Sequence, residues 1–402
     1  MIIIGIESEG TGTNEQIRGV ILTGRTKNEP VPVARGCLIK ALDGQILHRK
    51  NFTDDTSFKE AVSDAVSEYL KDGPVPNFVV LPINHSALEK ENADVDLLSV
   101  AVKEAFAKHG HSVETMVLAS NLYDYQHVDL IHVGEHLLSH EDEAKLLANS
   151  KLKQRVVKTL GVPSNISWQY IGALASRPET NAILKKYQGK KNVLFSLGGK
   201  TENDAIKFTI KDAENLLNAA IKLKAFGYNV IFTNSPRTPN DVTDYLFEKC
   251  KIFHMDFYNS KKVATTEEER TNFRVYDGKH NAEFQRDLEE IGNIYPAILS
   301  VCDFAVYTHD SFSYTSDAAA IGLPSVVYTK NEIDASRPDC HKLFKLCCEQ
   351  GHVMDLDEAL ACVKEGKPVV TKKMDNISQQ LVTAMKAKHA VSRGRTQHRE
   401  TL

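Results

Sequence analysis

Three short polar or glycine-containing segments each follow an apolar run in the second half of the chain. They are Gly198-Gly199 after VLFSL, residues 234–238 after VIFT, and residues 309–313 after FAVYT. If the apolar runs are parallel strands, these turns emerge at one edge of a sheet, where α/β proteins bind ligands. Glycine lets a ligand approach the backbone, and the free N–H groups of a helix start favour phosphate. The pattern predicts a nucleotide pocket without a P-loop.

The side chains of these turns are of the types that hold a diphosphate and a ribose. Arg237 supplies a fixed cation with planar donors that suit a diphosphate. Asp317 lies one helical turn past Ser313 and can accept hydrogen bonds from ribose hydroxyls. The full set of residues that we expect at this binding edge is Gly198, Gly199, Ser235, Arg237, Asp310, Ser311, Ser313 and Asp317.

Three residues of the first half are candidates for a general base, a group that must titrate near the working pH. His85 follows VVLPIN, His136 follows LIHV and Glu135, and Glu9 lies in the glycine-rich turn ESEGTGTN. That turn lacks the spacing of a phosphate-binding P-loop and the third glycine of GxGxxG. Because its two acidic residues would repel phosphate, we expect it to line the acceptor side of a cleft. The choice among His136, His85 and Glu9 stays open.

The bulk composition predicts two domains and no overall attraction for nucleic acids or membranes, since the chain has 402 residues and a net charge of −4. Seven cysteines without a CxxC pair indicate a reducing compartment. The first residues read as a buried strand rather than a signal peptide, and no apolar run reaches the roughly 20 residues of a membrane helix. We therefore expect a cytoplasmic protein that is not an integral membrane protein.

The last residues differ from the rest of the chain in charge. Lys386, Lys388, Arg393, Arg395 and Arg399 form a basic C-terminal stretch. This stretch is typical of a solvated chain end, and the alternative is a contact for an anionic acceptor or surface.

Apolar periodicity predicts two halves in which strands and helices alternate, and hence an α/β fold with mostly parallel sheets. In the first half we expect strands at 2–6, 78–81, 115–118, 130–133 and 168–172, and helices from 15, within 52–70 and at 95–109. In the second half we expect strands at 193–197, 229–233, 252–257, 304–308 and 325–328, and helices at 211–226 and 374–390. The predicted domains are 1–178 and 190–372, followed by a closing segment at 373–402.

These residues resemble the GT-B glycosyltransferase fold and, more narrowly, the mitochondrial-fission ELM-type family of glycosyltransferase-like proteins. The resemblance rests on LGG at 197–199, NSPRTP at 234–239, THDSFSYTSDAAAIGLPSVV at 308–327, GEH at 134–136 and IGAL at 171–174. In the family's Ser-Arg-Arg-Thr-Pro segment, Pro236 replaces the first arginine and Arg237 stands at the second. In its Asp-Ser-x-Ser-Met turn, Asp310, Ser311 and Ser313 match, Tyr314 replaces methionine, and Asp317 replaces the following glutamate.

The resemblance implies two Rossmann-like domains facing a cleft, with a closing helix that returns to the first domain. The second domain would bind a nucleotide-sugar donor, such as a UDP-sugar, and the first would bind the acceptor. GT-B enzymes generally need neither metal nor cofactor, because cations and helix N-termini stabilise the departing diphosphate. In agreement, Asp54-Asp55 and the pair Asp355 and Asp357 are predicted helix starts rather than metal ligands.

The activity implied is metal-independent transfer of a sugar from the nucleotide sugar to an acceptor hydroxyl. The acceptor stays open among a glycan, a lipid-linked sugar and a nucleic acid. Two alternatives remain: a non-catalytic scaffold of the same fold that recruits a protein partner, and a nucleotide-sugar epimerase.

Overall fold

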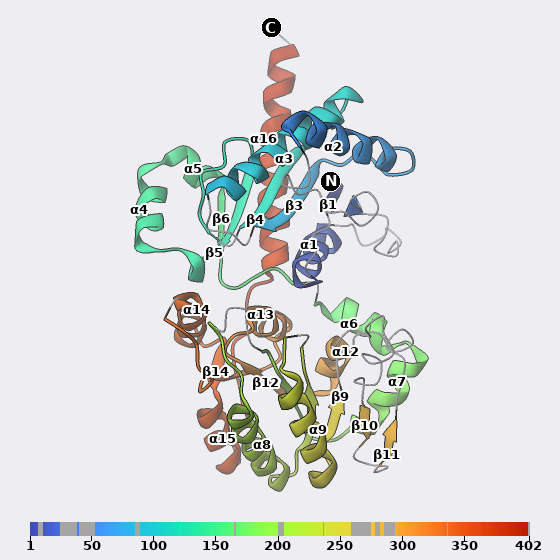
Figure 1. Cartoon of the computed structure of the whole chain (residues 1–402), viewed down its shortest axis with the longest axis vertical. Coiled ribbons are helices and arrows are strands. Elements are labelled where there is room, and N and C mark those ends of the chain that lie inside the picture. Colours follow the sequence, from blue (N-terminus) through green and yellow to red (C-terminus); the bar gives the residue numbers. More distant parts are fainter. Residues whose placement is uncertain are drawn as a thin grey trace. The chain divides into compact units, whose positions relative to one another are not determined.

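The computed structural model of the chain divides into two compact units (Figure 1). Unit 1 comprises Met1–Asn165 and Asn376–Leu402, and unit 2 comprises Ile166–Asp375. The residues that the structure describes are 1–6, 11–24, 38–39, 53–84, 89–119, 121–164, 166–199, 205–235, 237–258, 275–277, 282–284, 294–335 and 337–400.

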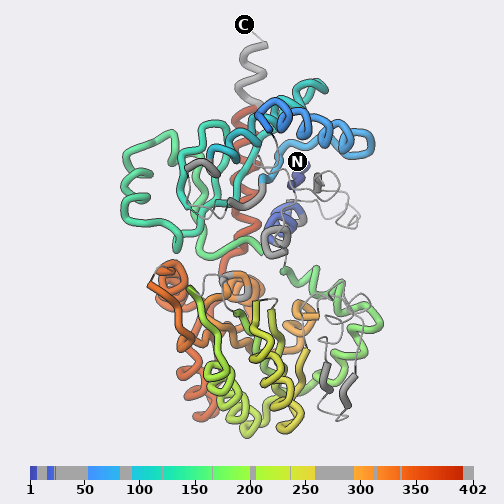
Figure 2. The backbone as a smooth tube through the Cα atoms, viewed as in Figure 1, coloured from blue at the N-terminus to red at the C-terminus, as the bar shows by residue number. Residues whose placement is uncertain are grey.

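Unit 1 is built on a parallel sheet with the strand order β2-β1-β3-β4-β5-β6. Its strands are β1 (Ile3–Ile6), β2 (Leu38–Ile39), β3 (Phe78–Asn84), β4 (Glu114–Ala119), β5 (Leu130–Gly134) and β6 (Val156–Thr159). Its helices are α1 (Thr11–Gly24), α2 (Asp55–Tyr69), α3 (Glu89–Lys108), the 3-10 helix Glu135–Leu137, α4 (His140–Ala148), α5 (Ser150–Arg155) and α16 (Ile377–Glu400). Figure 2 traces the chain as it leaves unit 2 and continues into α16, which belongs to unit 1.

Helix α2 illustrates why these segments fold as they do. Asp54 caps the helix by accepting the Ser57 N–H at 2.8 Å, which satisfies a backbone donor that has no partner within the helix. The apolar side chains of Phe58, Val62 and Val66 then recur at a helical spacing and are buried in the core of unit 1. Asp54 is thus a helix start, as predicted.

Unit 2 contains a sheet with the order β11-β10-β9-β8-β7-β12-β13-β14, in which all neighbours from β9 to β14 are parallel. Its strands are β7 (Asn192–Ser196), β8 (Asn229–Thr233), β9 (Asp256–Tyr258), β10 (Val275–Asp277), β11 (Ala282–Phe284), β12 (Phe304–Thr308), β13 (Ser325–Tyr328) and β14 (Val353–Asp355). Its helices are α6 (Trp168–Ala175), α7 (Pro178–Leu184), the 3-10 helix Lys185–Tyr187, α8 (Ile210–Ala225), α9 (Asn240–Phe253), α12 (Tyr295–Ile298), the 3-10 helix Leu299–Val301, α13 (Phe312–Ile321), α14 (Pro338–Glu349) and α15 (Leu356–Lys364).

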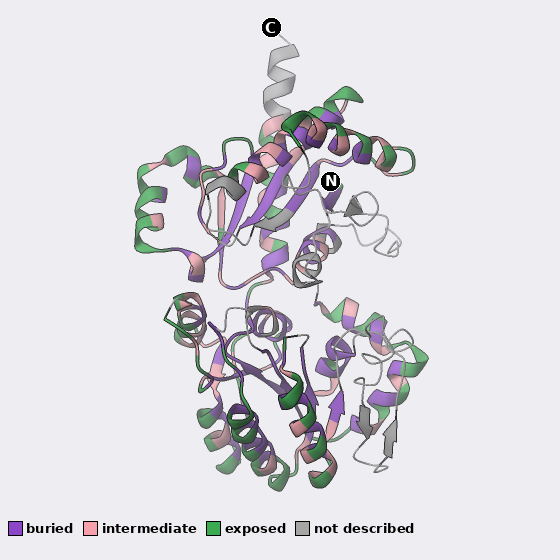
Figure 3. Ribbon diagram, in the orientation of Figure 1, coloured by how far each residue is buried: buried purple, intermediate pink, exposed green. Residues whose placement is uncertain are grey.

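Strand β7 shows how the core of unit 2 is divided by the sheet. Val193 and Phe195 pack in one apolar cluster with residues of α8 and α9, while Leu194 packs in a second cluster with residues of α6, α7 and α12. Both faces of the strand are therefore buried, as Figure 3 shows for the central strands of this sheet. This explains why the strand reads as a continuous apolar run rather than an alternating one.

Two sequence expectations differ from the structure near the start of unit 2. The strand expected at 168–172 is wrong, because this segment is helix α6, capped by the Ser167 side chain, which accepts the Tyr170 N–H at 3.1 Å. The unit also begins at Ile166, before the predicted boundary, because Ile171 of α6 and Leu184 of α7 pack in the same cluster as Leu194.

A smaller difference concerns the end of one element. Helix α9 continues to Phe253, so the strand expected at 252–257 is reduced to β9. Among the described helices, none combines the length and apolar character needed to cross a bilayer.

Candidate functional site

The three turns singled out in the sequence lie together at the carboxyl edge of the sheet of unit 2. Strand β7 is flanked on either side by β8 and β12, and both pairs are parallel. The Gly198 N–H donates to Thr308 Oγ1 at 2.7 Å, and the Gly199 N–H donates to Asp310 Oδ2 at 3.1 Å. On the other side, the Ser235 hydroxyl donates to the Gly198 carbonyl at 3.2 Å. The central turn is thus hydrogen-bonded to both of its neighbours.

The two glycines are required by this contact between turns. A Cβ atom on Gly198 would lie 2.3 Å from Asp310 Oδ2, and one on Gly199 would lie 2.0 Å from the backbone oxygen of Arg237. Neither distance is compatible with a side chain. The position that a Cβ atom would take at each glycine is filled by a neighbouring turn, and the approach of a ligand to the glycine backbone stays a prediction.

Arg237 and Asp310 form an ion pair across the site. Arg237 Nη2 lies 2.9 Å from Asp310 Oδ2, and the Asp310 side chain has no exposed surface while that of Arg237 is 43% exposed. One N–H group of the guanidinium is thus held by a buried carboxylate, while the arginine side chain keeps part of its surface exposed. The second carboxylate oxygen, Oδ1, is buried and has no hydrogen-bond partner within the described residues.

Helix α13 begins at this edge, directly after the Asp310 turn. Ser311 is its buried N-cap residue, half-buried Ser313 lies in the first turn, and no acidic side chain occurs in that turn. The positive end of the helix dipole and its N-terminal N–H groups therefore face the same edge as Arg237, an arrangement that favours an anion.

Asp317 lies in the second turn of α13 and is buried. The hydroxyl of Tyr295, on α12, donates a hydrogen bond to Asp317 Oδ2 at 3.4 Å. The carboxylate thus contacts a residue of another helix of unit 2. Its role toward a ribose stays a prediction.

A second arginine near this edge was not among the sequence candidates. Arg337 precedes α14 and its Nη2 lies 2.7 Å from Asp339 Oδ2. The hydrogen bond to Asp339 raises the pKa of Arg337, and the negative charge of Asp310 contributes in the same direction. Arg337 lies in the segment after β13, which pairs with β12. An arginine after a neighbouring parallel strand is the sequence feature from which this residue could have been predicted.

His309, between β12 and Asp310, packs against α14. Its ring lies 4.8 Å from that of His341 and 5.3 Å from that of Phe344, measured between ring centroids. Burial and the nearby His341 lower the pKa of His309 to about 4, so the ring is neutral at pH 7. The described residues contain no group of three or more His, Cys, Asp or Glu side chains that could hold a metal ion.

Of the general-base candidates in unit 1, the structure describes one. His136 lies in the 3-10 helix after β5 and is 2% exposed. Its ring packs against Gly134, where a Cβ would lie 2.4 Å from the ring. The neighbouring His132 is also buried, and burial together with the charge of His136 lowers the pKa of His132 to about 3. His85 and Glu9 lie outside the described residues, and the identity of the base stays a prediction.

The chain was compared with protein families, curated sequences and solved structures. The family model described as mitochondrial fission ELM1 matches residues 97–369. No curated protein sequence matches the chain. The solved structure of UDP-GlcNAc 2-epimerase from Methanocaldococcus jannaschii is similar at 11% identity and a TM-score of 0.53, covering 96% of this chain and 99% of that chain.

Two further structures align with lower TM-scores. The S. aureus MnaA–UDP co-structure has 11% identity and a TM-score of 0.44, covering 95% of this chain and 94% of that one. The Streptomyces sp. SF2575 glycosyltransferase SsfS6 has 11% identity and a TM-score of 0.36, covering 97% of this chain and 96% of that one. The family match and the archaeal structure establish the two-sheet GT-B fold and leave the activity to chemical argument.

Proposed function

Since this chain belongs to the mitochondrial fission ELM1 family and has the GT-B fold, we propose that unit 2 binds a nucleotide sugar and that the chain transfers the sugar to an acceptor hydroxyl without a metal ion. The expected donor is a UDP-sugar. The family match covers more than half of the chain and includes all three turns of the candidate site.

The observation that carries this proposal is the Arg237–Asp310 pair. A buried carboxylate orients the guanidinium, and the exposed part of the guanidinium keeps donors for an anionic ligand. Helix α13 directs its N-terminus to the same edge. A cation and a helix N-terminus that converge on one place form a diphosphate site built from protein groups alone.

The chemistry would proceed as a displacement at the anomeric carbon of the donor. A base in unit 1, for which His136, His85 and Glu9 remain candidates, would remove the proton of the acceptor hydroxyl. The acceptor oxygen would bond to the anomeric carbon while the bond to the diphosphate oxygen breaks. Arg237 and the backbone amide of Ser313 would stabilise the negative charge that develops on the departing diphosphate, whereas the Ser311 amide is already donated to the Thr308 carbonyl at 3.1 Å.

A titration with nucleoside diphosphates tests the binding step. Trp168, the one tryptophan of the sequence, donates from Nε1 to the Ile321 carbonyl at the end of α13 at 3.0 Å, so its fluorescence reports on this helix. We expect UDP to bind and Arg237→Met to weaken binding by at least tenfold, the loss of one charge-assisted contact. Arg177→Met, an exposed arginine at the start of α7, serves as the matched control. If a folded protein binds no nucleoside diphosphate in calorimetry, the proposal is refuted.

The two alternative functions separate in the product analysis. An epimerase, the activity named for the similar archaeal structure, would convert UDP-GlcNAc without any acceptor. A scaffold would bind the nucleotide, or a protein partner, without turnover of any donor. Incubation with UDP-GlcNAc, with and without an acceptor panel, followed by mass spectrometry of the nucleotide and sugar products, distinguishes these cases from transfer.

A further inference from the structure

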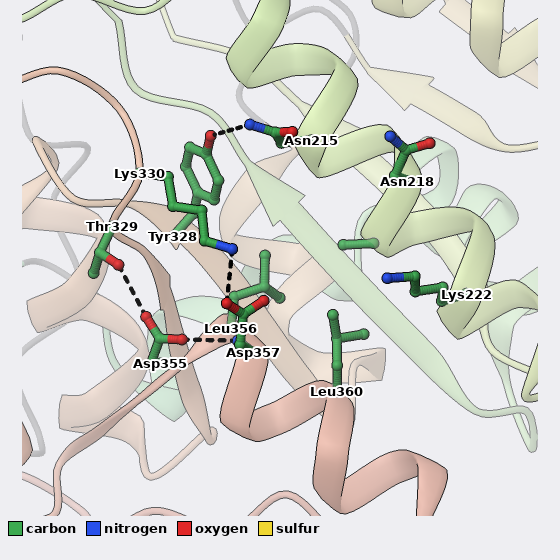
Figure 4. A pocket seen from close by; sticks show the side chains of 11 residues that line it. Asn215, Asn218, Lys222, Tyr328, Thr329, Lys330, Asp355, Leu356, Asp357 and Leu360 are labelled. Atoms are coloured by element: carbon green, nitrogen blue, oxygen red, sulfur yellow. Dashed lines mark hydrogen bonds and ion pairs between the residues drawn. The ribbon is translucent and has the colours of Figure 1, made fainter.

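A separate cavity lies in unit 2 between helices α8 and α15, beside the ends of β13 and β14. Its volume is about 200 Å³. Figure 4 shows its walls, with Asn215, Asn218 and Lys222 along α8 on one side and Asp355, Asp357 and Leu360 at the start of α15 on the other. Tyr328, Thr329 and Lys330 connect the two walls, and none of the lining residues belongs to the expected donor site.

The α8 wall is made by one face of the helix. Asn215, Asn218, Ala219 and Lys222 are spaced by three and four residues, so their side chains lie in a row over two turns. Asn218 and Lys222 are exposed, whereas Ala219 is buried against the core. The α8 wall therefore presents a row of amide and ammonium groups beside the apolar side chain of Ala219.

Most polar groups of the opposite wall already have partners. Asp355 caps α15 by accepting the Asp357 N–H at 2.8 Å and also accepts the Thr329 hydroxyl at 2.9 Å. Lys330 Nζ lies 2.7 Å from Asp357 Oδ2. On the α8 side, one Asn215 amide hydrogen is donated to the Tyr328 hydroxyl, at 3.0 Å. This network fixes the shape of the cavity.

Two side chains of the α8 wall keep all their hydrogen-bonding groups available. Within the described residues, the Asn218 amide and the Lys222 ammonium make no side-chain hydrogen bond or ion pair. The charges of Lys330 and Asp357 neutralise one another, and the Asp355 carboxylate is engaged by the helix N-terminus that it caps. The ammonium of Lys222 is therefore the charged group available to a ligand.

We propose that this cavity is a second carbohydrate-binding site, distinct from the donor edge, and that it takes one monosaccharide residue that carries a carboxylate. Hydroxyl groups of a sugar both donate and accept hydrogen bonds, as the amides of Asn215 and Asn218 do. The C–H face of a sugar ring is apolar and matches Ala219, Leu356 and Leu360. Lys222 pairs with the carboxylate of the sugar.

The size of the cavity limits the ligand to one small ring. A volume of about 200 Å³ lies below the range of about 300–1,000 Å³ that is usual for pockets that hold drug-sized ligands. The site is thus suited to a terminal residue of an acidic glycan. The proposal does not depend on catalysis and stands apart from the function proposed above.

The test uses the full-length protein and D-glucuronate as the probe, with D-glucose and inorganic phosphate as comparisons. Saturation-transfer-difference NMR identifies contacts to the ring, and titration gives the Kd. We expect D-glucuronate to bind about tenfold more tightly than D-glucose, the worth of one charge-assisted hydrogen bond. Lys222→Met should remove this preference, and Asn218→Leu should weaken both sugars.

Lys211→Met is the matched control, because Lys211 is an exposed lysine of the same helix that does not line the cavity. Circular dichroism confirms that each variant is folded. The proposal is overturned if neither sugar binds, if Lys211→Met changes the Kd as much as Lys222→Met does, or if phosphate displaces glucuronate while the ring gives no NMR contact, which would mark an anion site only.

Discussion

The ion pair between Arg237 and Asp310 predicts that its two partners have unequal effects on the stability of unit 2. Arg237→Met leaves the Asp310 carboxylate buried, with the Gly199 N–H as its remaining hydrogen-bond donor among the residues that the structure describes. Breaking a buried pair in this way costs about 3–5 kcal/mol, and we expect about 3 kcal/mol because the exposed side of Arg237 already admits water. Asp310→Asn keeps an acceptor for Gly199 and leaves an arginine side chain that is 43% exposed and can be hydrated, so it should cost about 1 kcal/mol.

The assay is urea unfolding, monitored by tryptophan fluorescence. The signal reports on unit 2 because Trp168, the one tryptophan in the sequence, lies in that unit. The expected difference of about 2 kcal/mol far exceeds the error of such a comparison. The double variant Arg237→Met/Asp310→Asn should be more stable than Arg237→Met alone, because it no longer buries an unpaired charge. An Asp310→Asn variant that is as unstable as Arg237→Met would refute this account of the pair.

Three further predictions follow from the site and its surroundings. Gly199→Ala should destabilise unit 2 and abolish nucleotide binding, because its Cβ would lie 2.0 Å from the Arg237 backbone oxygen, whereas Gly172→Ala, where the Cβ meets nothing within 4 Å, should be neutral or slightly stabilising in the same unfolding assay. His309 should make unit 2 sensitive to acid: its pKa is lowered to about 4 in the folded chain, so the unfolded chain takes up the proton first, and stability present above about pH 6.5 is lost as the pH falls toward 4. Between pH 6.5 and 5 this loss amounts to about 2 kcal/mol, and His309→Gln should reduce it in urea titrations at the two pH values. Replacing Arg393, Arg395 and Arg399 by glutamine should reduce the salt dependence of acceptor use if the acceptor is a nucleic acid, and an unchanged slope would exclude that class.

The strands of unit 2 were predictable because parallel strands buried on both faces are continuous apolar runs that end in polar turns. Asn229–Thr233, Phe304–Thr308 and Ser325–Tyr328 have the predicted bounds. The segment at 168–172 was not predictable in this way, because a short apolar run is compatible with a buried strand or a buried helix. The Ser167 cap, together with packing against Leu194 and Ile231, decides for the helix.

The sequence by itself determined which turns share an edge of the sheet, since the alternation of strands and helices indicates parallel strands, whose carboxyl ends lie at the same edge. It also pointed to Arg237 and Asp310 as residues of that edge. Only the tertiary structure decided what these residues do to one another: Gly199 and Asp310 are 111 positions apart in the chain, and their contact depends on how the turns pack.

The same holds for burial. The sequence marks His136 as a histidine after a strand, but packing against Gly134 makes it 2% exposed. Asn218 and Lys222 are exposed residues of α8 that no sequence pattern singles out, and only the approach of α15 turns that surface into a cavity. Such properties arise from atoms contributed by distant segments, and no local pattern of residues encodes where those atoms meet.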